Sequence, residues 1–251
     1  FTVSKDVYAS VNDLLDENKQ KNGIQKEEKQ EMNFVEEQDV FQNLIGSNGS
    51  LKKPIEQMKT SIFYPNTSLP VFLHGPTGSG KSFMARKIYE FAVQEGILKP
   101  DAPFVIMNCA QYVNNIELLS SNLFGYVKGA FTGAYATTKG LLEAADGGML
   151  FLDEVHRLNS ESQEKLFVFL DQGIFRRMGE SEGWHKAKVR MVMATTENLE
   201  SNFLDTFLRR IPIIVQIPSL KERGEQERLQ FIYHFFIEES KVLNKKMKVS
   251  G

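Results

Sequence analysis

Residues 75–82 read Gly75-Pro76-Thr77-Gly78-Ser79-Gly80-Lys81-Ser82 and fit the pattern G-x-x-x-x-G-K-S/T. The run follows an apolar stretch, Val71 to His74, and precedes an amphipathic stretch from Phe83 to Val93. A glycine-rich loop between a buried strand and a helix lets backbone N–H groups converge on phosphate oxygens, and the helix dipole adds to the attraction. The sequence therefore predicts a phosphate-binding loop, in which Lys81 reaches the outer phosphates of ATP and Ser82 ligates Mg²⁺.

Four more apolar runs follow the first along the chain. They are Phe104 to Met107, Met149 to Leu152, Val189 to Ala194, and Ile213 to Ile217. Unbroken apolar strands that alternate with amphipathic helices are typical of a parallel sheet covered on both faces. We therefore expect an α/β fold in which helices flank a five-stranded parallel sheet.

The helix after the third of these strands carries its own boundary signals. Ser160 and Gln163 predict a capping box at its start, and Gly173 predicts its end. Its predicted buried stripe consists of Leu166, Phe167 and Leu170.

Two acids, Asp153 and Glu154, follow the strand Met149 to Leu152. An acid pair there is more often a solvated strand end, but after a phosphate-binding loop it fits nucleotide chemistry. Asp153 is placed to hold Mg²⁺, and Glu154 to orient and deprotonate the attacking water. Asn108 ends the second strand and could reach Glu154 if the strands are neighbours, although asparagine is also a common turn former. The combination predicts a P-loop nucleoside triphosphatase.

Composition limits the compartment and the partners. The chain has 251 residues, of which 41% are hydrophobic, and its net charge is -2 from 30 basic and 32 acidic residues. Its apolar runs fall far short of the roughly 20 residues that a membrane helix needs. With Cys109 as its single cysteine, it can form no internal disulfide. We expect a cytoplasmic protein that binds no membrane, and no main DNA-binding surface on this chain.

The chain divides into three predicted regions. Residues 1–39 combine an amphipathic helix, Ser4 to Gln20, with a polar linker. Residues 40–218 form the predicted ATPase core, and residues 219–251 the start of a helical lid that the chain cuts short. The helical spacing of Phe235 and Phe236 in that lid favours packing over recognition.

Residues 129–134 read Gly129-Ala130-Phe131-Thr132-Gly133-Ala134, six uncharged residues with one aromatic and two glycines. Such a run has too little bulk to pack a core and too much glycine to hold a helix. We therefore expect a mobile contact loop with an exposed Phe131.

These residues resemble the ATPase domain of bacterial enhancer-binding activators of sigma-54 RNA polymerase, a branch of the AAA+ superfamily. The resemblance spans about Leu44 to Arg223, and Gly-Ala-Phe-Thr-Gly-Ala is the family's signature for the loop that contacts sigma-54. Further matching runs are Leu123 to Lys128, Ala144 to Gly148, and Phe175 to Gly179. The runs Leu44 to Leu51 and Leu208 to Pro212 resemble LevR-like activators, which carry phosphotransferase-system regulation domains.

The resemblance implies a ring, usually a hexamer, in which ATP lies between neighbouring subunits and an arginine of the next subunit completes the site. Arg209 is then the first candidate for that arginine, and Arg210 the second. The run Leu44-Ile45-Gly46 would form the adenine-side wall. Asn108 would hold Glu154 inactive until the loop engages its target, the sigma-54 RNA polymerase holoenzyme. Promoter and enhancer DNA would be bound by domains outside this chain.

The chain also departs from the family pattern. Thr196 stands where the family has a sensing asparagine, which predicts slower or differently tuned hydrolysis. The family's two arginines are several residues apart, whereas here the upstream position falls near Phe203 and the second arginine is Arg210. We favour an ATP-hydrolysing domain that remodels the sigma-54 holoenzyme. The alternatives are a nucleotide-gated scaffold with weak hydrolysis and an AAA+ remodeller of another client, against which the signature loop argues.

Overall fold

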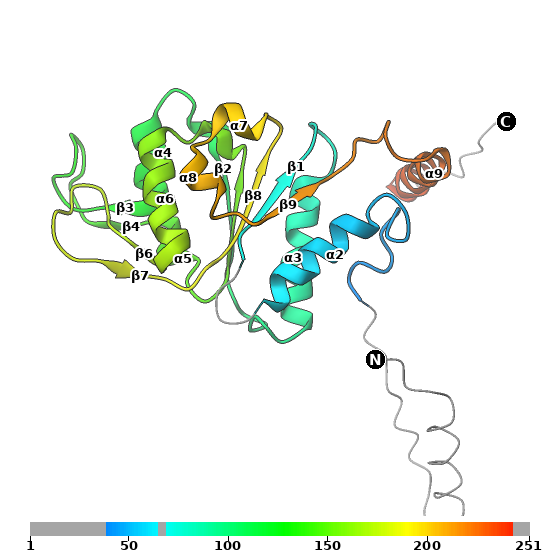
Figure 1. Cartoon of the computed structure of the whole chain (residues 1–251), viewed down its shortest axis with the longest axis horizontal. Helices are drawn as coiled ribbons and strands as arrows, with labels where there is room; N and C mark the ends of the chain where they lie inside the picture. Colours follow the sequence, from blue (N-terminus) through cyan, green and yellow to red (C-terminus); the bar gives the residue numbers. More distant parts are fainter. Residues whose placement is uncertain (1–38, 65–68, 243–251) are drawn as a thin grey trace, which may run out of the picture. The chain divides into compact units, whose positions relative to one another are not determined.

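The structure is a computed structural model that describes residues 39–64 and 69–242 (Figure 1). Its central sheet consists of β1 (Val71–His74), β2 (Phe104–Asn108), β5 (Met149–Asp153), β8 (Arg190–Thr195) and β9 (Ile213–Gln216). The strands lie in the order β2-β5-β8-β1-β9, and every neighbouring pair is parallel. The predicted α/β class and the five predicted strands are confirmed.

The strand order decides where the site forms. Because all five strands are parallel, the loops that follow β1, β2, β5 and β8 leave the same edge of the sheet. In open α/β sheets this carboxyl edge is where ligands bind. The phosphate-binding loop after β1 and the acidic pair after β5 therefore share one edge, with only β8 between their strands.

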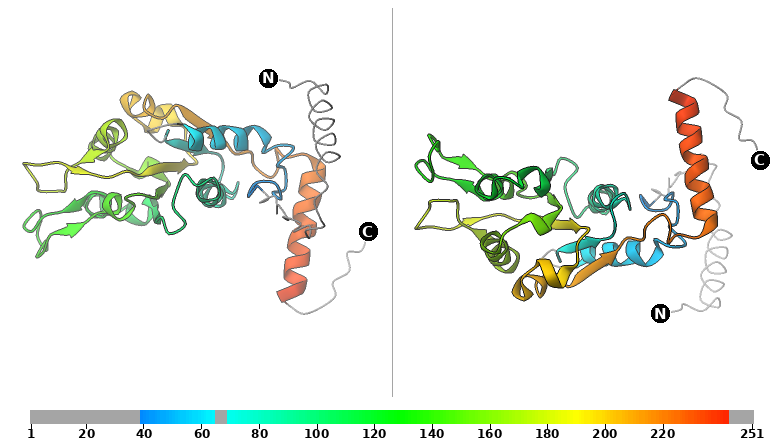
Figure 2. Two further views of the ribbon diagram at one scale, coloured as in Figure 1. Left: turned by 90° about the horizontal axis from the view of Figure 1, so that it is seen from below. Right: turned by 90° about the horizontal axis from the view of Figure 1, so that it is seen from above.

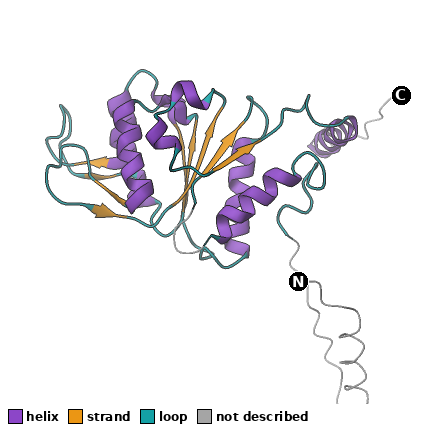
Figure 3. Ribbon diagram, in the orientation of Figure 1, coloured by secondary structure: helices purple, strands orange, loops and turns teal. Residues whose placement is uncertain are grey.

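Helices cover both faces of the sheet (Figures 1 and 3). One face carries α2 (Lys52–Phe63) and α3 (Lys81–Gln94), and the other carries α4 (Ile116–Phe124), α5 (Leu141–Ala144), α6 (Ser160–Gln172), α7 (Leu199–Asn202) and α8 (Asp205–Leu208). Successive residues of β1 enter opposite layers, since Val71 and Leu73 pack with α2 and α3 while Phe72 packs with α4 and α6. This two-sided burial explains why the strands are continuous apolar runs.

Two small hairpins extend from the layer of α4 to α6. One pairs β3 (Gly125–Tyr126) with β4 (Thr138–Lys139) and carries the signature loop, and the other pairs β6 (Ile174–Phe175) with β7 (His185–Lys186). A bridge between Tyr126 and Met178 joins them, and they lie side by side in both views of Figure 2. The two insertions therefore form one structural unit.

The predicted capping box of α6 is wrong. The N-cap is Asn159, not Ser160, and its side chain accepts a backbone N–H bond from the first turn. The side chain of Gln163 is buried and serves a longer-range contact, since it donates to the Leu158 carbonyl at 3.0 Å and accepts from the Leu204 N–H at 2.9 Å. Asparagine caps a helix as well as serine does, so the local pattern did not distinguish the two.

The predicted end of α6 is confirmed, and its predicted buried stripe is confirmed only in part. Gly173 ends the helix in the left-handed conformation, with φ of 67°, as predicted. Leu166 is buried, whereas Phe167 and Leu170 are only half-buried, and Phe169 completes the packed stripe.

The last described helix is α9 (Glu225–Val242). The predicted packing of Phe235 and Phe236 is wrong for the described part of the chain, where they are 63% and 38% exposed. Neither α9 nor another helix within residues 39–64 and 69–242 has the length and apolar character to span a bilayer. The predicted helix Ser4 to Gln20 and nearly all of the linker lie outside the described residues, and the division into three regions stays a prediction.

Candidate active site

The phosphate-binding loop joins β1 to α3 at the carboxyl edge of the sheet. Gly80 is the N-cap of α3 with φ of +97°, a backbone conformation that residues with a side chain rarely adopt. No described atom lies within 4 Å of the place where a Cβ of Gly80 or Gly78 would stand. The start of α3 thus faces open space, and its N–H groups can meet phosphate oxygens there.

Lys81, the first residue of α3, lies across this loop. Its side chain is buried, and Nζ donates to the Gly75 carbonyl at 2.8 Å and to the Pro76 carbonyl at 3.1 Å. Burial lowers the pKa of Lys81, and the charges of Glu154 and Asp153 oppose that shift. The ammonium group therefore lies where the loop and both predicted acids can act on the same ligand.

The two predicted magnesium ligands contact each other. The Ser82 hydroxyl donates to Oδ2 of Asp153 at 3.2 Å, although 71 positions separate them in the sequence. The backbone N–H of Glu154 donates to Oδ1 of Asp153 at 3.0 Å and so orients that carboxylate. A hydroxyl and a carboxylate are hard oxygen donors of the kind that Mg²⁺ prefers, so the donor set fits the predicted ion.

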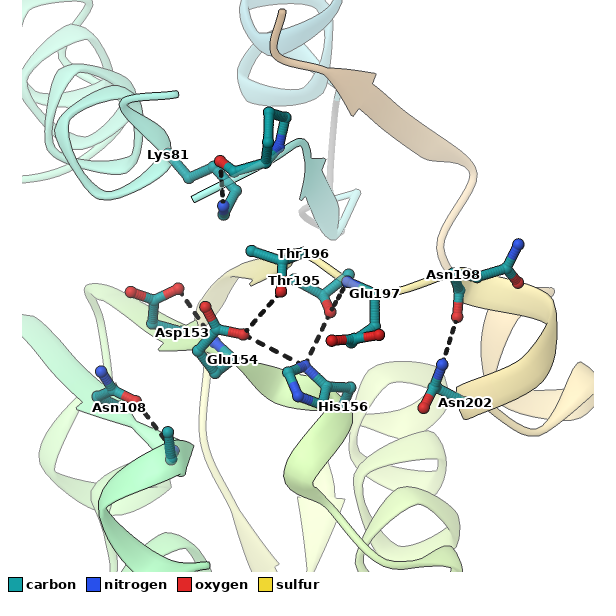
Figure 4. Close-up of polar contacts among 12 residues, drawn as sticks. Lys81, Asn108, Asp153, Glu154, His156, Thr195, Thr196, Glu197, Asn198 and Asn202 are labelled. Carbon is teal, nitrogen blue, oxygen red and sulfur yellow. Dashed lines mark hydrogen bonds and ion pairs between the residues drawn. The ribbon is translucent and has the colours of Figure 1, made fainter. Parts of the chain in front are cut away.

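Glu154 has a constrained backbone and two side-chain partners. It is the one non-glycine residue with a positive φ, 50°, in the described part of the chain. Its Oε2 accepts a hydrogen bond from the Thr196 hydroxyl at 3.4 Å and lies 3.3 Å from Nδ1 of His156 (Figure 4). A non-glycine residue in this region costs about 1–3 kcal/mol, and such strain is often found at functional sites. The predicted sensor, Thr196, is thus brought to the predicted base.

Asn108 and Glu154 are not brought together. The Asn108 side chain accepts from the backbone N–H of Ala110 at 2.9 Å and caps the 3₁₀ turn η1 (Cys109–Tyr112). The predicted neighbourhood of the strands is correct, because Asn108 lies opposite Asp153 in the register of β2 and β5. The local cap prevails because the N–H two residues away is within reach of the amide. The expectation that Asn108 holds Glu154 is therefore wrong for this conformation.

The predicted adenine-side wall, Leu44-Ile45-Gly46, lies in a half-buried turn before α2. Glu227 of α9 holds this turn, accepting from the backbone N–H of Ser50 at 2.9 Å and from its hydroxyl at 2.5 Å. Just before α9, Arg223 donates to the Ser79 carbonyl of the phosphate-binding loop at 3.2 Å. Arg223 and Glu227 therefore contact the loop and the turn respectively, and the adenine-side wall stays a prediction.

The two arginine candidates differ in their contacts. Arg210 forms an ion pair with Asp171 at 3.1 Å and lies over the Phe167 ring, 5.1 Å from its centroid. Arg209 is exposed, and its side chain has no hydrogen bond or ion pair within residues 39–64 and 69–242. Phe203, at the family's upstream position, is buried in the core. A side chain that must reach a neighbouring subunit has to be free of its own, which favours Arg209.

The signature loop closes on itself through backbone hydrogen bonds. The Gly129 N–H donates to the Ala134 carbonyl at 2.9 Å, and the Ala134 N–H to the Phe131 carbonyl at 3.0 Å. Gly129 and Gly133 have φ values of +83° and +104°, which explains why glycine occupies both ends of this turn.

The expectation of an exposed Phe131 is wrong in degree. The ring is half-buried, with its centroid 5.0 Å from that of Tyr126. Phe131 and Thr132 line a cleft of about 440 Å³, whose other wall is formed by Asn115 and by Glu117, Leu118 and Ser121 of α4. The exposed aromatic of this segment is Tyr135, at 86%. Burying a phenylalanine ring against another aromatic ring is energetically favourable, and Tyr126 lies close enough to Phe131 for that contact.

The two hairpins are fastened to each other and to α5. The Val127 N–H donates to the Met178 carbonyl at 3.1 Å, and the Met178 N–H to the Gly125 carbonyl at 2.9 Å. Arg177 donates to both carboxylate oxygens of Glu143 on α5, at 2.9 and 2.7 Å. Burial alone would raise the pKa of Glu143, but the hydrogen bonds and charge of Arg177 hold it below its ordinary value. The loop is therefore fastened to the second hairpin, and through it to α5.

Three residues of the site were missed by the sequence reasoning. Arg223 and Glu227 carry no local signal, because their partners lie far away in the sequence. His156 follows Glu154 by two positions, and this closeness in the sequence is the one signal that pointed to it.

Comparison with known proteins agrees with this geometry. The family profile described as "Sigma-54 interaction domain" matches residues 44–214. The chain is 50% identical over 206 residues to the transcriptional regulatory protein LevR of Bacillus subtilis, covering 82% of this chain and 22% of LevR. It is 43% identical over 213 residues to the transcriptional regulatory protein DagR of Salmonella typhimurium, covering 84% and 22%. The chain thus spans about a fifth of the length of these relatives.

Solved structures agree as well. The structure of NtrX from Brucella abortus in complex with ATP superimposes with a TM-score of 0.67 at 26% identity, covering 83% of this chain and 44% of NtrX. The fold of this chain, a five-stranded parallel sheet flanked by helices, is that of AAA+ proteins. With the profile, the relatives and the fold in agreement, the chain belongs to the family of sigma-54 interaction domains and is similar to LevR within it.

Proposed function

We propose that this chain binds ATP with Mg²⁺ at the carboxyl edge of its sheet, hydrolyses it, and uses residues 129–134 to engage sigma-54 RNA polymerase. The observation that carries the nucleotide part is the contact between Ser82 and Asp153, 3.2 Å apart beside Lys81 at the open start of α3. Two oxygen donors, one ammonium group and a helix N-terminus then meet at one place, which suits a magnesium-bound triphosphate.

Each residue has one task in this reaction. Lys81 and the N–H groups of the loop would hold the outer phosphates, and Ser82 and Asp153 would hold Mg²⁺, which would supply positive charge to neutralise the phosphates. Glu154 accepts a proton from water as the water oxygen bonds to the γ-phosphorus. The bond from that phosphorus to the bridging oxygen of ADP breaks, so the products are ADP and phosphate. Arg209 of a neighbouring subunit would stabilise the transferred group in a ring, for which a hexamer is the proposed form.

The partner and the setting are supported by the family. The run from Gly129 to Ala134 is the family's contact signature, and the chain belongs to the sigma-54 interaction domains. LevR and DagR are both described as transcriptional regulatory proteins, and NtrX was solved with ATP. We therefore propose that this chain is the motor part of a transcriptional activator, with DNA bound by other parts of that protein.

Replacing Lys81 by alanine tests the nucleotide site. The change removes a charge-assisted contact to the phosphates, so the Kd for ATP is expected to rise by about ten- to a hundredfold. Isothermal titration with ATP and Mg²⁺ measures that constant, and a phosphate-release assay follows turnover. Lys87→Ala is the matched control, because Lys87 lies on the same helix but pairs with Glu90. Equal ATP affinity in the two variants would place the nucleotide elsewhere.

A further inference from the structure

His156 lies against the proposed catalytic base. It belongs to the 3₁₀ turn η2 (Val155–Arg157) directly after Glu154, and its side chain is 7% exposed. Nδ1 of the imidazole lies 3.3 Å from Oε2 of Glu154 and 3.0 Å from Oγ1 of Thr195. That hydroxyl also accepts from the backbone N–H of Glu197 at 3.1 Å, which fixes its position. The ring is therefore held between β8 and the base.

The two carboxylate oxygens of Glu154 have different surroundings. Oε2 meets both the Thr196 hydroxyl and Nδ1 of His156, and the two dashed lines converge on it in Figure 4. Within the described ranges, no hydrogen bond or ion pair reaches Oε1. The Glu154 side chain is 24% exposed, so the unpaired oxygen can meet water. One oxygen is thus anchored and the other is available for a proton.

The protonation of the imidazole follows from its contacts. Nδ1 forms its hydrogen bond with Oγ1 of Thr195 at 3.0 Å and lies 3.3 Å from Oε2 of Glu154. A carboxylate oxygen only accepts, so a proton on Nδ1 suits both neighbours, whereas a lone pair there would face the carboxylate. Nε2 is buried and has no hydrogen-bond partner among the described residues, and an unpaired acceptor there costs less than an unpaired charged N–H would. Burial lowers the pKa of His156, as does Arg157, against the charges of Glu154 and Glu197. The neutral ring with its proton on Nδ1 satisfies all of these conditions.

We propose that His156 is the positioning residue of the base: its ring is fixed by Thr195, and the polar contact of Nδ1–H with Oε2 of Glu154 keeps that oxygen turned inward, so that Oε1 faces the water that attacks ATP. This rests on the proposed function. In this arrangement His156 does for Glu154 what the third member of a catalytic triad does for its base. This role differs from the one that the resemblance suggested for Asn108, which was to hold Glu154 inactive; the Asn108 side chain caps η1 instead.

Two variants of His156 separate orientation from structure. His156→Leu keeps the volume but removes the donor, and His156→Asn returns an amide N–H near the place of Nδ1. We expect His156→Leu to lower kcat for ATP hydrolysis by about ten- to a hundredfold, a part of what a positioned base contributes. KM for ATP should stay unchanged, and His156→Asn should restore most of kcat. His234→Leu, on an exposed position of α9, is the matched control and should have wild-type turnover.

A double variant distinguishes this inference from the proposed function. If His156 acts through Glu154, then His156→Leu causes no further loss in a Glu154→Gln background. The positioning role would be overturned if His156→Leu had wild-type or raised turnover. It would also be overturned if His156→Leu and His156→Asn lost turnover equally and both bound ATP more weakly. Wild-type turnover in Glu154→Gln alone would instead overturn the assignment of the base.

Nitrogen-15 spectra of the imidazole test the geometry without turnover. At neutral pH and without nucleotide, the expected spectrum is that of a neutral ring protonated at Nδ1. A ring protonated at Nε2, or at both nitrogens, contradicts the contact on which the inference depends.

Discussion

Replacing Glu154 by glutamine is expected to lower kcat for ATP hydrolysis by about two to four orders of magnitude, the usual contribution of a positioned general base. Glutamine keeps the shape of the side chain and an oxygen that can accept from Thr196, so ATP binding should remain close to that of the wild type. What is lost is the ability to take a proton from water. Single-turnover hydrolysis with the protein in excess over ATP measures the chemical step directly.

The matched control for this change is Glu161→Gln. Glu161 lies on α6, where it is exposed and pairs with Lys165, so turnover should not change. If Glu154→Gln retains wild-type turnover and sigma-54 engagement while Lys81→Ala loses ATP binding and engagement, the chain is a nucleotide-gated scaffold. That result would favour the scaffold over the ATP-hydrolysing domain. Thr196 at the sensor position is the sequence feature that motivates this test.

Replacing Phe131 by alanine is expected to weaken capture of sigma-54 by about 30- to 1000-fold, the range of an aromatic anchor at the centre of an interface. ATP hydrolysis should stay close to wild type, because no hydrogen bond or ring contact joins Phe131 to Lys81, Asp153 or Glu154. The assay is co-purification of sigma-54 with the protein in the presence of ADP-aluminium fluoride, a transition-state analogue.

Loss of packing must be separated from loss of contact in this variant. Phe131 gives up its ring contact with Tyr126, so the thermal midpoint of the variant should be measured as well. Phe63→Ala is the matched control, since Phe63 is 54% exposed at the end of α2 and lies outside the hairpins. Wild-type capture of sigma-54 by Phe131→Ala would refute the contact role of the loop.

The sheet and the phosphate-binding loop could be predicted because their signals are local. Each strand is a short apolar run buried on both faces, and the glycines and lysine of the loop form one contiguous sequence pattern. The closeness of Ser82 and Asp153 could also be predicted, because the carboxyl ends of parallel strands meet at one edge of the sheet whatever their order. The positions of the loop, Ser82 and Asp153 therefore follow from a parallel α/β sheet, whatever the order of its strands.

Side-chain partners could not be predicted in the same way. The sequence allows the Asn108 side chain either to reach Glu154 or to cap the turn at Ala110, and it does not favour one over the other. The structure has the cap. The contact of His156 with Thr195 requires β5 and β8 to be adjacent, which the order of apolar runs does not reveal. Such choices are decided by distances between strands and loops, so pattern reasoning leaves them open.

The signature loop shows a related limit. Its composition predicts a glycine-rich turn that packs no core of its own. The two glycines, Gly129 and Gly133, indeed have positive φ. The half-burial of Phe131 depends on Tyr126 and on the neighbouring face of α4, which are brought there by the pairing of β3 with β4. The loop therefore offers its aromatic ring from a packed position, and contact with a partner requires that the ring be released or approached from the cleft.

The central claim is that the nucleotide at Lys81 decides whether the loop at Phe131 holds sigma-54. The most direct test is the amount of sigma-54 retained by the wild-type protein without nucleotide, with ADP, and with ADP-aluminium fluoride, each with Mg²⁺. We expect retention with the transition-state analogue alone. Equal retention in all three conditions, or none with the analogue bound at the site, would contradict it.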